Sequence, residues 1–216
     1  MNERAAAQAG FLVLVLALCA RVVAAAADTT PLDKYFDGLN TLRASFTQTV
    51  KDAHGKDVDR STGSLVVSRP GKFRWEVHPK AGGQGQLLVA DGRNVWFLDR
   101  DLEQVTVKPV DTALSSTPAM LLSGASNLRE SFTLTSAGTR EGFDWVLVEP
   151  RRPESDFRRA LFGFKKGNLQ RMIIDDRLGQ TATIDFDSVT RNAQVAPDEV
   201  SFTPPPGTDV IGKPVS

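Results

Sequence analysis

The hydrophobic pattern of the chain changes near residue 44. Between Leu32 and Leu42, apolar side chains recur at every third or fourth position, which is the spacing of one face of an α-helix. Thr30 and Pro31 come directly before this run. Threonine caps the free N–H groups of a helix start and proline fits its first turn. The sequence therefore predicts an amphipathic helix over residues 30–43.

After residue 44 the chain has the pattern of short β-strands separated by Gly, Pro, Asn and Asp turns. Strands joined by short turns pair as antiparallel neighbours, and a sheet of about eleven strands curves toward a barrel. We expect strands near residues 44–51, 60–68, 72–78, 86–90, 94–99, 103–107, 131–135, 143–149, 157–165, 169–175 and 180–189.

A second short helix is predicted over residues 117–123, where Thr117 and Pro118 resemble a helix start and four apolar residues follow. Two such pieces cover little of a large apolar sheet face. Either the barrel is filled by its own side chains, or an apolar hollow remains beneath a small helical lid.

Residues 1–27 are predicted to be a secretory signal that is cleaved, leaving residues 28–216 as a single domain. Arg4 precedes an uncharged run over residues 11–20, and small alanines end the segment at residue 27. The uncharged run is shorter than the roughly 20 residues that a membrane-spanning helix needs.

The only cysteine, Cys19, lies inside this predicted signal. Leu18 precedes it, whereas a lipid-attachment motif places a small residue there, so we expect ordinary cleavage without acylation. The mature chain is then expected to have no disulfide, thiolate metal site or thiol nucleophile.

Charge and residue chemistry argue against several classes of protein. The 26 basic and 26 acidic residues balance, whereas a nucleic-acid-binding protein normally has a basic excess. The two histidines, His54 and His78, belong to no metal-binding spacing, and no G-x-S-x-G motif is present. Asp185 and Asp187 alternate with apolar residues and are expected on a solvent face. We therefore predict no catalytic residue, no metal and no cofactor.

A basic cluster between residues 151 and 166 has two interpretations. It is either a solvated hairpin or a surface that steers an acidic partner. Its cations are Arg151, Arg152, Arg158, Arg159, Lys165 and Lys166.

Several short motifs follow one another in order over residues 30–207. They are Ala44-Ser45-Phe46-Thr47-Gln48, Ser68-Arg69-Pro70-Gly71-Lys72-Phe73-Arg74-Trp75, Leu88-Val89-Ala90-Asp91-Gly92, Val95-Trp96-Phe97, Thr117-Pro118-Ala119-Met120-Leu121-Leu122 and Phe202-Thr203-Pro204-Pro205-Pro206-Gly207. This ordered set, behind a signal segment, resembles the LolA family of periplasmic outer-membrane lipoprotein carriers.

The resemblance implies a mainly β fold, an unclosed antiparallel β-barrel with a helical lid over a hydrophobic cavity. It implies that the cavity binds the acyl chains of lipoproteins in the periplasm. It further implies that an inner-membrane lipoprotein-releasing ABC transporter supplies the lipoprotein and that an outer-membrane lipoprotein receptor accepts it. We expect a monomer with no nucleic-acid partner and no stable membrane insertion.

The resemblance also assigns roles to residues. Arg69 matches the arginine that hydrogen-bonds the lid backbone and keeps the empty cavity closed, and Phe73 matches a residue of the handover interface. Phe36 and Leu122 match lid positions that touch the cavity. The further apolar residues expected in the cavity or lid are Leu32, Leu39, Trp75, Trp96, Met120 and Leu121. The two tryptophans among them fit an ordinary core equally well.

A tight turn at Pro70-Gly71 predicts that Arg69 pairs with Lys72 and Ser68 with Phe73, which places Arg69 and Phe73 on opposite faces. Pro-Gly is not a favoured two-residue hairpin turn, however, so a bulge or longer loop remains open.

Two other functions stay open from the sequence. One is a lipoprotein-sensing or receptor module on a similar curved sheet, which acylation of the N-terminal cysteine would favour. The other is a hydrolase acting on lipid or envelope material, which the missing nucleophile and the scarce histidines count against.

Overall fold

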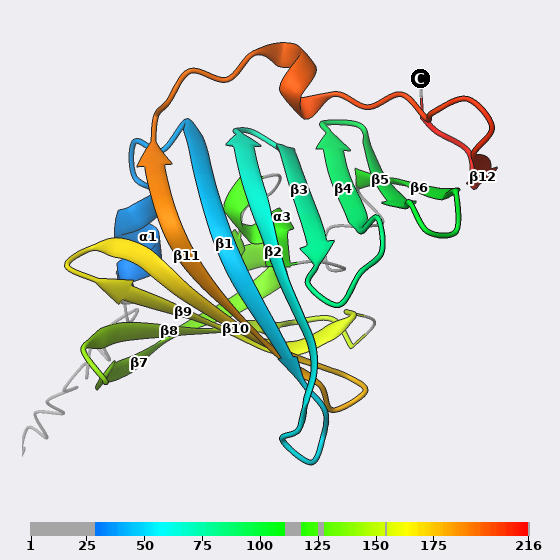
Figure 1. Ribbon diagram of the computed structural model, residues 1–216. Coiled ribbons are helices and arrows are strands. Elements are labelled where there is room, and N and C mark those ends of the chain that lie inside the picture. The colour runs from blue at the N-terminus through cyan, green and yellow to red at the C-terminus, as the bar shows by residue number, and fades with distance from the viewer. Residues whose placement is uncertain (1–28, 111–117, 125–127, 154, 216) are drawn as a thin grey trace, which may run out of the picture.

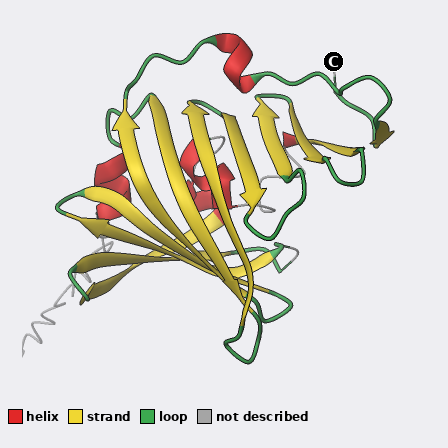
Figure 2. Ribbon diagram, viewed as in Figure 1, coloured by secondary structure: helices red, strands yellow, loops and turns green. Residues whose placement is uncertain are grey.

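The computed structural model describes residues 29–110, 118–124, 128–153 and 155–215, which form one open, curved β-sheet with the helices at residues 31–36 and 118–123 against one face (Figures 1 and 2). The predicted signal, Cys19 and Thr117 lie outside these residues. The helices are α1 (Pro31–Phe36), α3 (Pro118–Ser123), α4 (Leu128–Ser131) and the 3-10 helix η1 (Pro197–Val200). The strands are β1 (Thr41–Lys51), β2 (Asp57–Ser68), β3 (Lys72–Pro79), β4 (Gln86–Asp91), β5 (Asn94–Asp99), β6 (Gln104–Pro109), β7 (Phe132–Arg140), β8 (Phe143–Pro150), β9 (Phe157–Lys165), β10 (Asn168–Asp176), β11 (Thr181–Arg191) and β12 (Asp209–Ile211).

Within the described residues the sheet has twelve strands in the order β12-β6-β5-β4-β3-β2-β1-β11-β10-β9-β8-β7. Every neighbouring pair is antiparallel except β12 and β6, which are parallel. The pairing of β1 with β11 joins the two halves of the chain, while β7 and β12 are the free edges, so the barrel is unclosed as predicted. The eleven predicted strands are all present. The short strand β12 was not predicted, because three residues carry no recognisable alternation.

The predicted helix over residues 30–43 is wrong in its second half. Helix α1 ends at Phe36, Gly38 follows with a φ of 63°, and β1 begins at Thr41. Leu42 is buried together with Ala44 and Phe46, which is the period of a strand. The spacing from Leu39 to Leu42 fits both periods, so the helical pattern was extended too far. Helix α4 was also not predicted.

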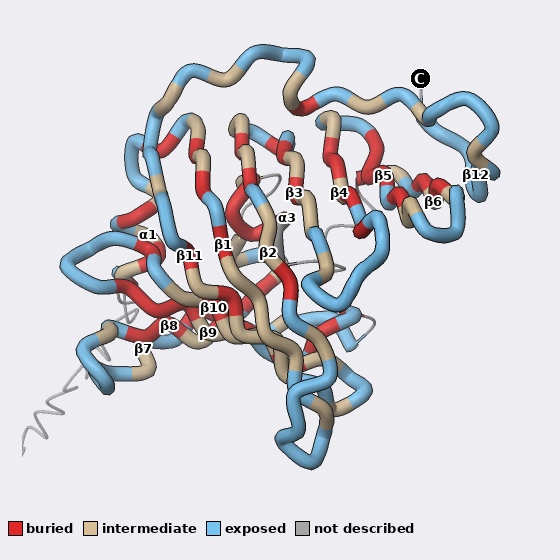
Figure 3. The backbone as a smooth tube through the Cα atoms, viewed as in Figure 1, coloured by how far each residue is buried: buried red, intermediate tan, exposed pale blue. Residues whose placement is uncertain are grey.

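The two faces of the sheet carry separate apolar clusters, and Figure 3 shows buried positions along most strands. We call the face against which α1 and α3 pack the inner face, and the opposite face the outer face. The inner cluster includes residues from both helices and from the strands of both halves of the sheet. The outer cluster is smaller and consists of Leu87, Val89, Trp96, Leu98, Val105 and Val107 with Phe202 packed against it.

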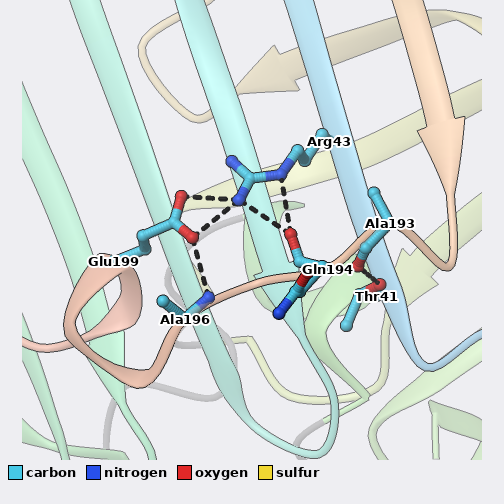
Figure 4. Close-up of polar contacts among 6 residues, drawn as sticks. All are labelled: Thr41, Arg43, Ala193, Gln194, Ala196 and Glu199. Carbon is cyan, nitrogen blue, oxygen red and sulfur yellow. Dashed lines mark hydrogen bonds and ion pairs between the residues drawn. The ribbon is translucent and has the colours of Figure 1, made fainter.

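The outer cluster is covered by the chain that follows β11, which crosses the strand ends in Figure 1. Phe202 packs on Trp96 with ring centroids 5.6 Å apart. Arg43 of β1 donates from Nη2 to both carboxylate oxygens of Glu199 at 2.6 Å and to the carbonyl of Gln194 at 2.9 Å (Figure 4). The hydrogen bonds from Arg43 hold the pKa of Glu199 below its usual value. This crossing segment therefore belongs to the folded domain.

The alternation predicted for β11 is confirmed. Ile184 and Phe186 are buried in the inner cluster, whereas Asp187 is exposed and Asp185 forms an ion pair with Arg171 at 2.6 Å. These carboxylates are structural surface groups.

Two arginines of the basic cluster contact the neighbouring strand. Arg159 forms an ion pair with Asp175 at 2.5 Å, and Arg158 donates to the carbonyl of Asp176 at 2.9 Å. Both arginines are exposed, so steering of an acidic partner stays a prediction.

Replacement of Gly63 by alanine is expected to lower the free energy of unfolding by about 1–3 kcal/mol. An added Cβ would overlap the ring of Phe46 and the carbonyl oxygen of Glu76, which is backbone and cannot turn away. Urea unfolding of both proteins measures the difference. Ser64→Ala, at the next position of β2, is the matched control and should change stability by less than about 0.5 kcal/mol.

Candidate functional site

Arg69 and Phe73 flank the turn between β2 and β3, and the register there differs from the predicted one. Ser68 pairs with Lys72, and Val67 with Phe73. Arg69 therefore lies in a three-residue turn rather than in the ladder, and the predicted pairing of Arg69 with Lys72 is wrong. Lengthening the turn by one residue brings Val67 and Phe73 to the same, inner face, where both are fully buried.

Arg69 binds the carboxyl end of α1. Its backbone N–H donates to the carbonyl of Asn40 at 2.8 Å, and its Nη1 donates to the carbonyls of Phe36 and Leu39 at 3.2 and 3.5 Å. The guanidinium also lies over the Phe36 ring, 4.6 Å from its centroid. The last carbonyls of a helix have no partner within the helix, so this arginine supplies donors where they are needed. Burial lowers the pKa of Arg69, and the group remains a cation at neutral pH.

The end of α3 meets the same turn. The backbone N–H of Gly71 donates to the carbonyl of Ser123 at 2.9 Å. A Cβ at Gly124 would overlap the guanidinium of Arg69, so a glycine at this position leaves room for the arginine. Both lid helices therefore end at one turn of the sheet, and Arg69 contacts both ends.

A second arginine, at the end of β11, also holds α1. Arg191, the last residue of β11, donates from Nη2 to the carbonyls of Tyr35 at 2.8 Å and Asp37 at 3.0 Å. Its guanidinium lies over the Tyr35 ring, 4.8 Å from the centroid. The next residue, Asn192, donates to the carbonyl of Gly38 at 2.9 Å. Sequence reasoning missed Arg191 because nothing local connects it to a helix more than 150 positions earlier.

The amino end of α1 carries a hydrogen-bonded carboxylate. Asp33 accepts from the backbone and hydroxyl of Thr30 at 2.7 and 2.8 Å and forms an ion pair with Arg129 of α4 at 2.6 Å. Burial raises the pKa of Asp33, but the hydrogen bonds from Thr30 and Arg129 outweigh burial and hold the pKa below its usual value. The carboxylate therefore joins α1 to α4 in its ionised form.

The lowered pKa of Asp33 leads us to predict that α1 is less stable in acid. A carboxyl whose pKa is lowered in the folded state stabilises that state above its unfolded pKa, and this stabilisation is lost as the pH falls through the folded pKa. The protection factors of α1 amides, which are the intrinsic exchange rates at each pH divided by the observed rates, should therefore fall below about pH 4, and Asp33→Asn should show low protection already at pH 7. Asp37→Asn, in the same segment but exposed, is the control. Equal exchange in Asp33→Asn and the unmodified protein at pH 7 would contradict this role.

Beyond the helices, the inner face opens into a groove of about 340 Å³. Trp75, Leu88 and Phe97 pair across three neighbouring strands and form its apolar row, with Val77 beside them. The remaining lining residues are Gln48, Asp59, Pro79 and Gln86. Phe97 is 37% exposed, which is unusual for a side chain on the face that carries the core.

Nine of the ten predicted site residues share the inner cluster or pack against it. They are Leu32, Phe36, Leu39, Phe73, Trp75, Met120, Leu121, Leu122 and, through Phe36 and Leu39, Arg69. The structure does not bring Trp96 to this site. Trp96 is in the outer cluster, and its Nε1 donates to the carboxylate of Asp91 at 2.7 Å.

Phe97, rather than Trp96, faces the groove. Strand β5 is apolar on both faces, so its alternation did not indicate which of these two neighbours points inward. The pairing of Phe97 with Leu88 in the register of β4 and β5 indicates that Phe97 points to the inner face.

The polar side chains that line the groove are Gln48, Asp59 and Gln86. Among the described residues, no three His, Cys, Asp or Glu side chains gather as a metal site would need. His54 and His78 are exposed, and His78 lies 3.8 Å from Glu76 on the outer face. The apolar row of the groove suits a ligand that is bound mainly by burial. None of the helices in the described part of the chain is long and apolar enough to cross a lipid bilayer.

Residues 37–203 match the sequence profile of LolA, described as outer membrane lipoprotein carrier protein. A protein of Dechloromonas aromatica (strain RCB) named outer-membrane lipoprotein carrier protein is 40% identical over 182 residues, which cover 84% of this chain and 86% of that protein. A protein of the same name from Methylococcus capsulatus is 39% identical over 201 residues, covering 92% of this chain and 95% of that protein. The crystal structure of an uncharacterized conserved protein from Thermus thermophilus has 13% identity and a TM-score of 0.51, covers 84% of this chain and 94% of that chain, and supports the fold alone.

Proposed function

Because the chain belongs to the LolA family of outer-membrane lipoprotein carrier proteins, we propose that it binds the acyl chains of lipoproteins against its inner face, along the open groove and beneath α1 and α3. In this proposal residues 1–27 are a cleaved signal and the mature protein is a periplasmic monomer without catalytic activity. It receives lipoprotein from an inner-membrane lipoprotein-releasing ABC transporter and passes it to an outer-membrane lipoprotein receptor.

The observation that carries the proposal is the apolar row of Trp75, Leu88 and Phe97, which continues the inner cluster into an open groove. Burial of an acyl chain contributes about 0.8 kcal/mol per methylene, so a chain of about 16 carbons gains on the order of 12 kcal/mol before the costs of binding. Such a gain needs no directional contact, only a sheltered apolar surface.

Release of the lipoprotein requires a free-energy contribution that opposes burial of its acyl chains. The contacts that hold the lid closed supply this contribution. Hydrogen bonds to a charged donor stabilise by about 1.5–3 kcal/mol. The contacts of Arg69 with Phe36 and Leu39 thus favour the closed, empty form without locking it. A cargo that opens the lid loses this stabilisation, which lowers its net affinity and allows an acceptor to take it.

The test uses the mature protein and a synthetic triacylated lipopeptide. The lipopeptide should co-elute with the protein in gel filtration, and it should leave the protein when vesicles bearing an outer-membrane lipoprotein receptor are added. The same peptide without acyl chains is the control and should not co-elute. Failure of the lipopeptide to co-elute would contradict the carrier function, and release into vesicles that lack the receptor would contradict the handover.

A further inference from the structure

The hydroxyl of Tyr35 in α1 is an enclosed polar group that has no use in the closed structure. Tyr35 is 2% exposed, and its phenolic oxygen is enclosed with no hydrogen-bond partner among the described residues. Its ring lies against Phe164 at 5.5 Å and Phe36 at 6.2 Å between centroids. The contacts of its backbone and ring with Arg191 do not involve the hydroxyl.

An enclosed hydroxyl without a partner destabilises the folded state, and buried polar groups are therefore nearly always paired. Replacing tyrosine by phenylalanine would remove this cost while keeping the ring. A tyrosine at this position thus calls for an acceptor that is absent from the closed, empty form.

The surroundings define what that acceptor is. Burial raises the pKa of Tyr35 to about 12, against a smaller lowering by Arg191, so the group is a neutral O–H donor at physiological pH. The neighbouring side chains of the inner cluster are apolar. A ligand that enters there must be apolar over most of its length and carry an acceptor without a formal charge.

We propose that the Tyr35 hydroxyl donates a hydrogen bond to the carbonyl oxygen of an acyl ester of the bound lipoprotein. This inference rests on the proposed function. The ester carbonyl is the acceptor at the head of an otherwise apolar chain, and its pairing with Tyr35 fixes how far that chain enters the lid region.

Opening of the lid contacts would let the ester carbonyl of the lipoprotein reach Tyr35. The carbonyl that Arg69 holds belongs to Phe36, the residue next to Tyr35. Release of this contact loosens the carboxyl end of α1, the helix that carries Tyr35, while Arg191 keeps its contact with the ring at 4.8 Å. The hydroxyl is therefore hidden in the empty carrier and offered in the loaded one.

Tyr35→Phe, which removes only the oxygen, tests the inference. Affinity is measured with a diacylglyceryl lipopeptide and with its dialkyl-ether analogue, which has the same chains but no ester carbonyl at the glycerol. We expect the variant to bind the ester about threefold to tenfold more weakly than the unmodified protein and to bind the ether equally well. The melting temperature of the empty variant should be equal or higher. Phe164→Leu, which alters packing against the same ring, should change both affinities by the same factor.

Three results would overturn the inference. Equal weakening for ester and ether would show that the oxygen acts through packing alone. A lower melting temperature of empty Tyr35→Phe would show that the hydroxyl already has a partner, such as a buried water, in the free protein. Unchanged affinity of Tyr35→Phe for the ester would refute the proposed hydrogen bond but not the carrier function. Failure of the unmodified protein to bind either lipopeptide would instead refute the carrier function itself.

Discussion

Replacing Arg69 with leucine is expected to leave the protein folded and able to bind lipoprotein, but to slow transfer to an acceptor by about tenfold or more. Arg69 lies in a turn outside the strand ladder, so the sheet does not depend on it. Loss of its hydrogen bonds to Phe36 and Leu39 removes about 1.5–3 kcal/mol from the closed, empty form. A difference of this size shifts the balance between closed and open forms by about 10- to 100-fold. Cargo is then held more tightly, because closure no longer offsets its binding.

The measurement is the rate of lipopeptide transfer from the loaded protein to receptor-bearing vesicles. Arg60→Leu is the matched control, since the Arg60 side chain is 66% exposed and bonds Asp57 in the β1–β2 hairpin, away from the lid. Arg69→Lys keeps the charge but cannot present two donors in a fixed plane, so its rate should fall between those of the leucine variant and the unmodified protein. Transfer by Arg69→Leu at the unmodified rate would show that this contact does not govern release.

The strands could be predicted because their signals are local. Most runs of alternating apolar residues end at a glycine, proline or aspartate turn, and strands that are consecutive in the chain are neighbours in the sheet except for β6 with β7 and β11 with β12. The exceptions are places where a local signal fits two structures. Leu39 and Leu42 fit a helical spacing, and only Gly38 and the burial of Leu42 in β1 decide for the strand.

The site could be predicted only in part, because its geometry depends on contacts between distant segments. Arg69 was found by resemblance, and its partners in α1 and the residues after it lie 30 or more positions away in the chain. The choice between Trp96 and Phe97 depends on the register of β4 with β5, which composition does not determine. Arg191 and the unpaired hydroxyl of Tyr35 have no sequence signal, because their surroundings are set only when α1 packs on the sheet.

Replacing Phe97 with glutamate is expected to weaken the binding of acylated peptides by about tenfold or more while the protein remains folded. Phe97 is 37% exposed in the groove, so the new carboxylate can stay hydrated when the groove is empty. An acyl chain lying along Trp75, Leu88 and Phe97 would remove that water without offering a partner. Burial of an unpaired charge costs several kcal/mol, which is more than enough to produce the expected loss. Titration of the variant with a triacylated lipopeptide measures the change.

Leu178→Glu is the control that adds the same negative charge outside the groove. Leu178 is 85% exposed in the turn after β10 and lies outside the groove, so this variant should bind as the unmodified protein does. Phe97→Leu keeps an apolar side chain and should lose less than about threefold, since the smaller residue removes only part of the contact area. Folded Phe97→Glu with unchanged affinity would mean that cargo does not reach this part of the inner face. The bound chains would then lie only under α1 and α3, where Phe73 and Leu122 are fully buried in the closed form and room requires the helices to move.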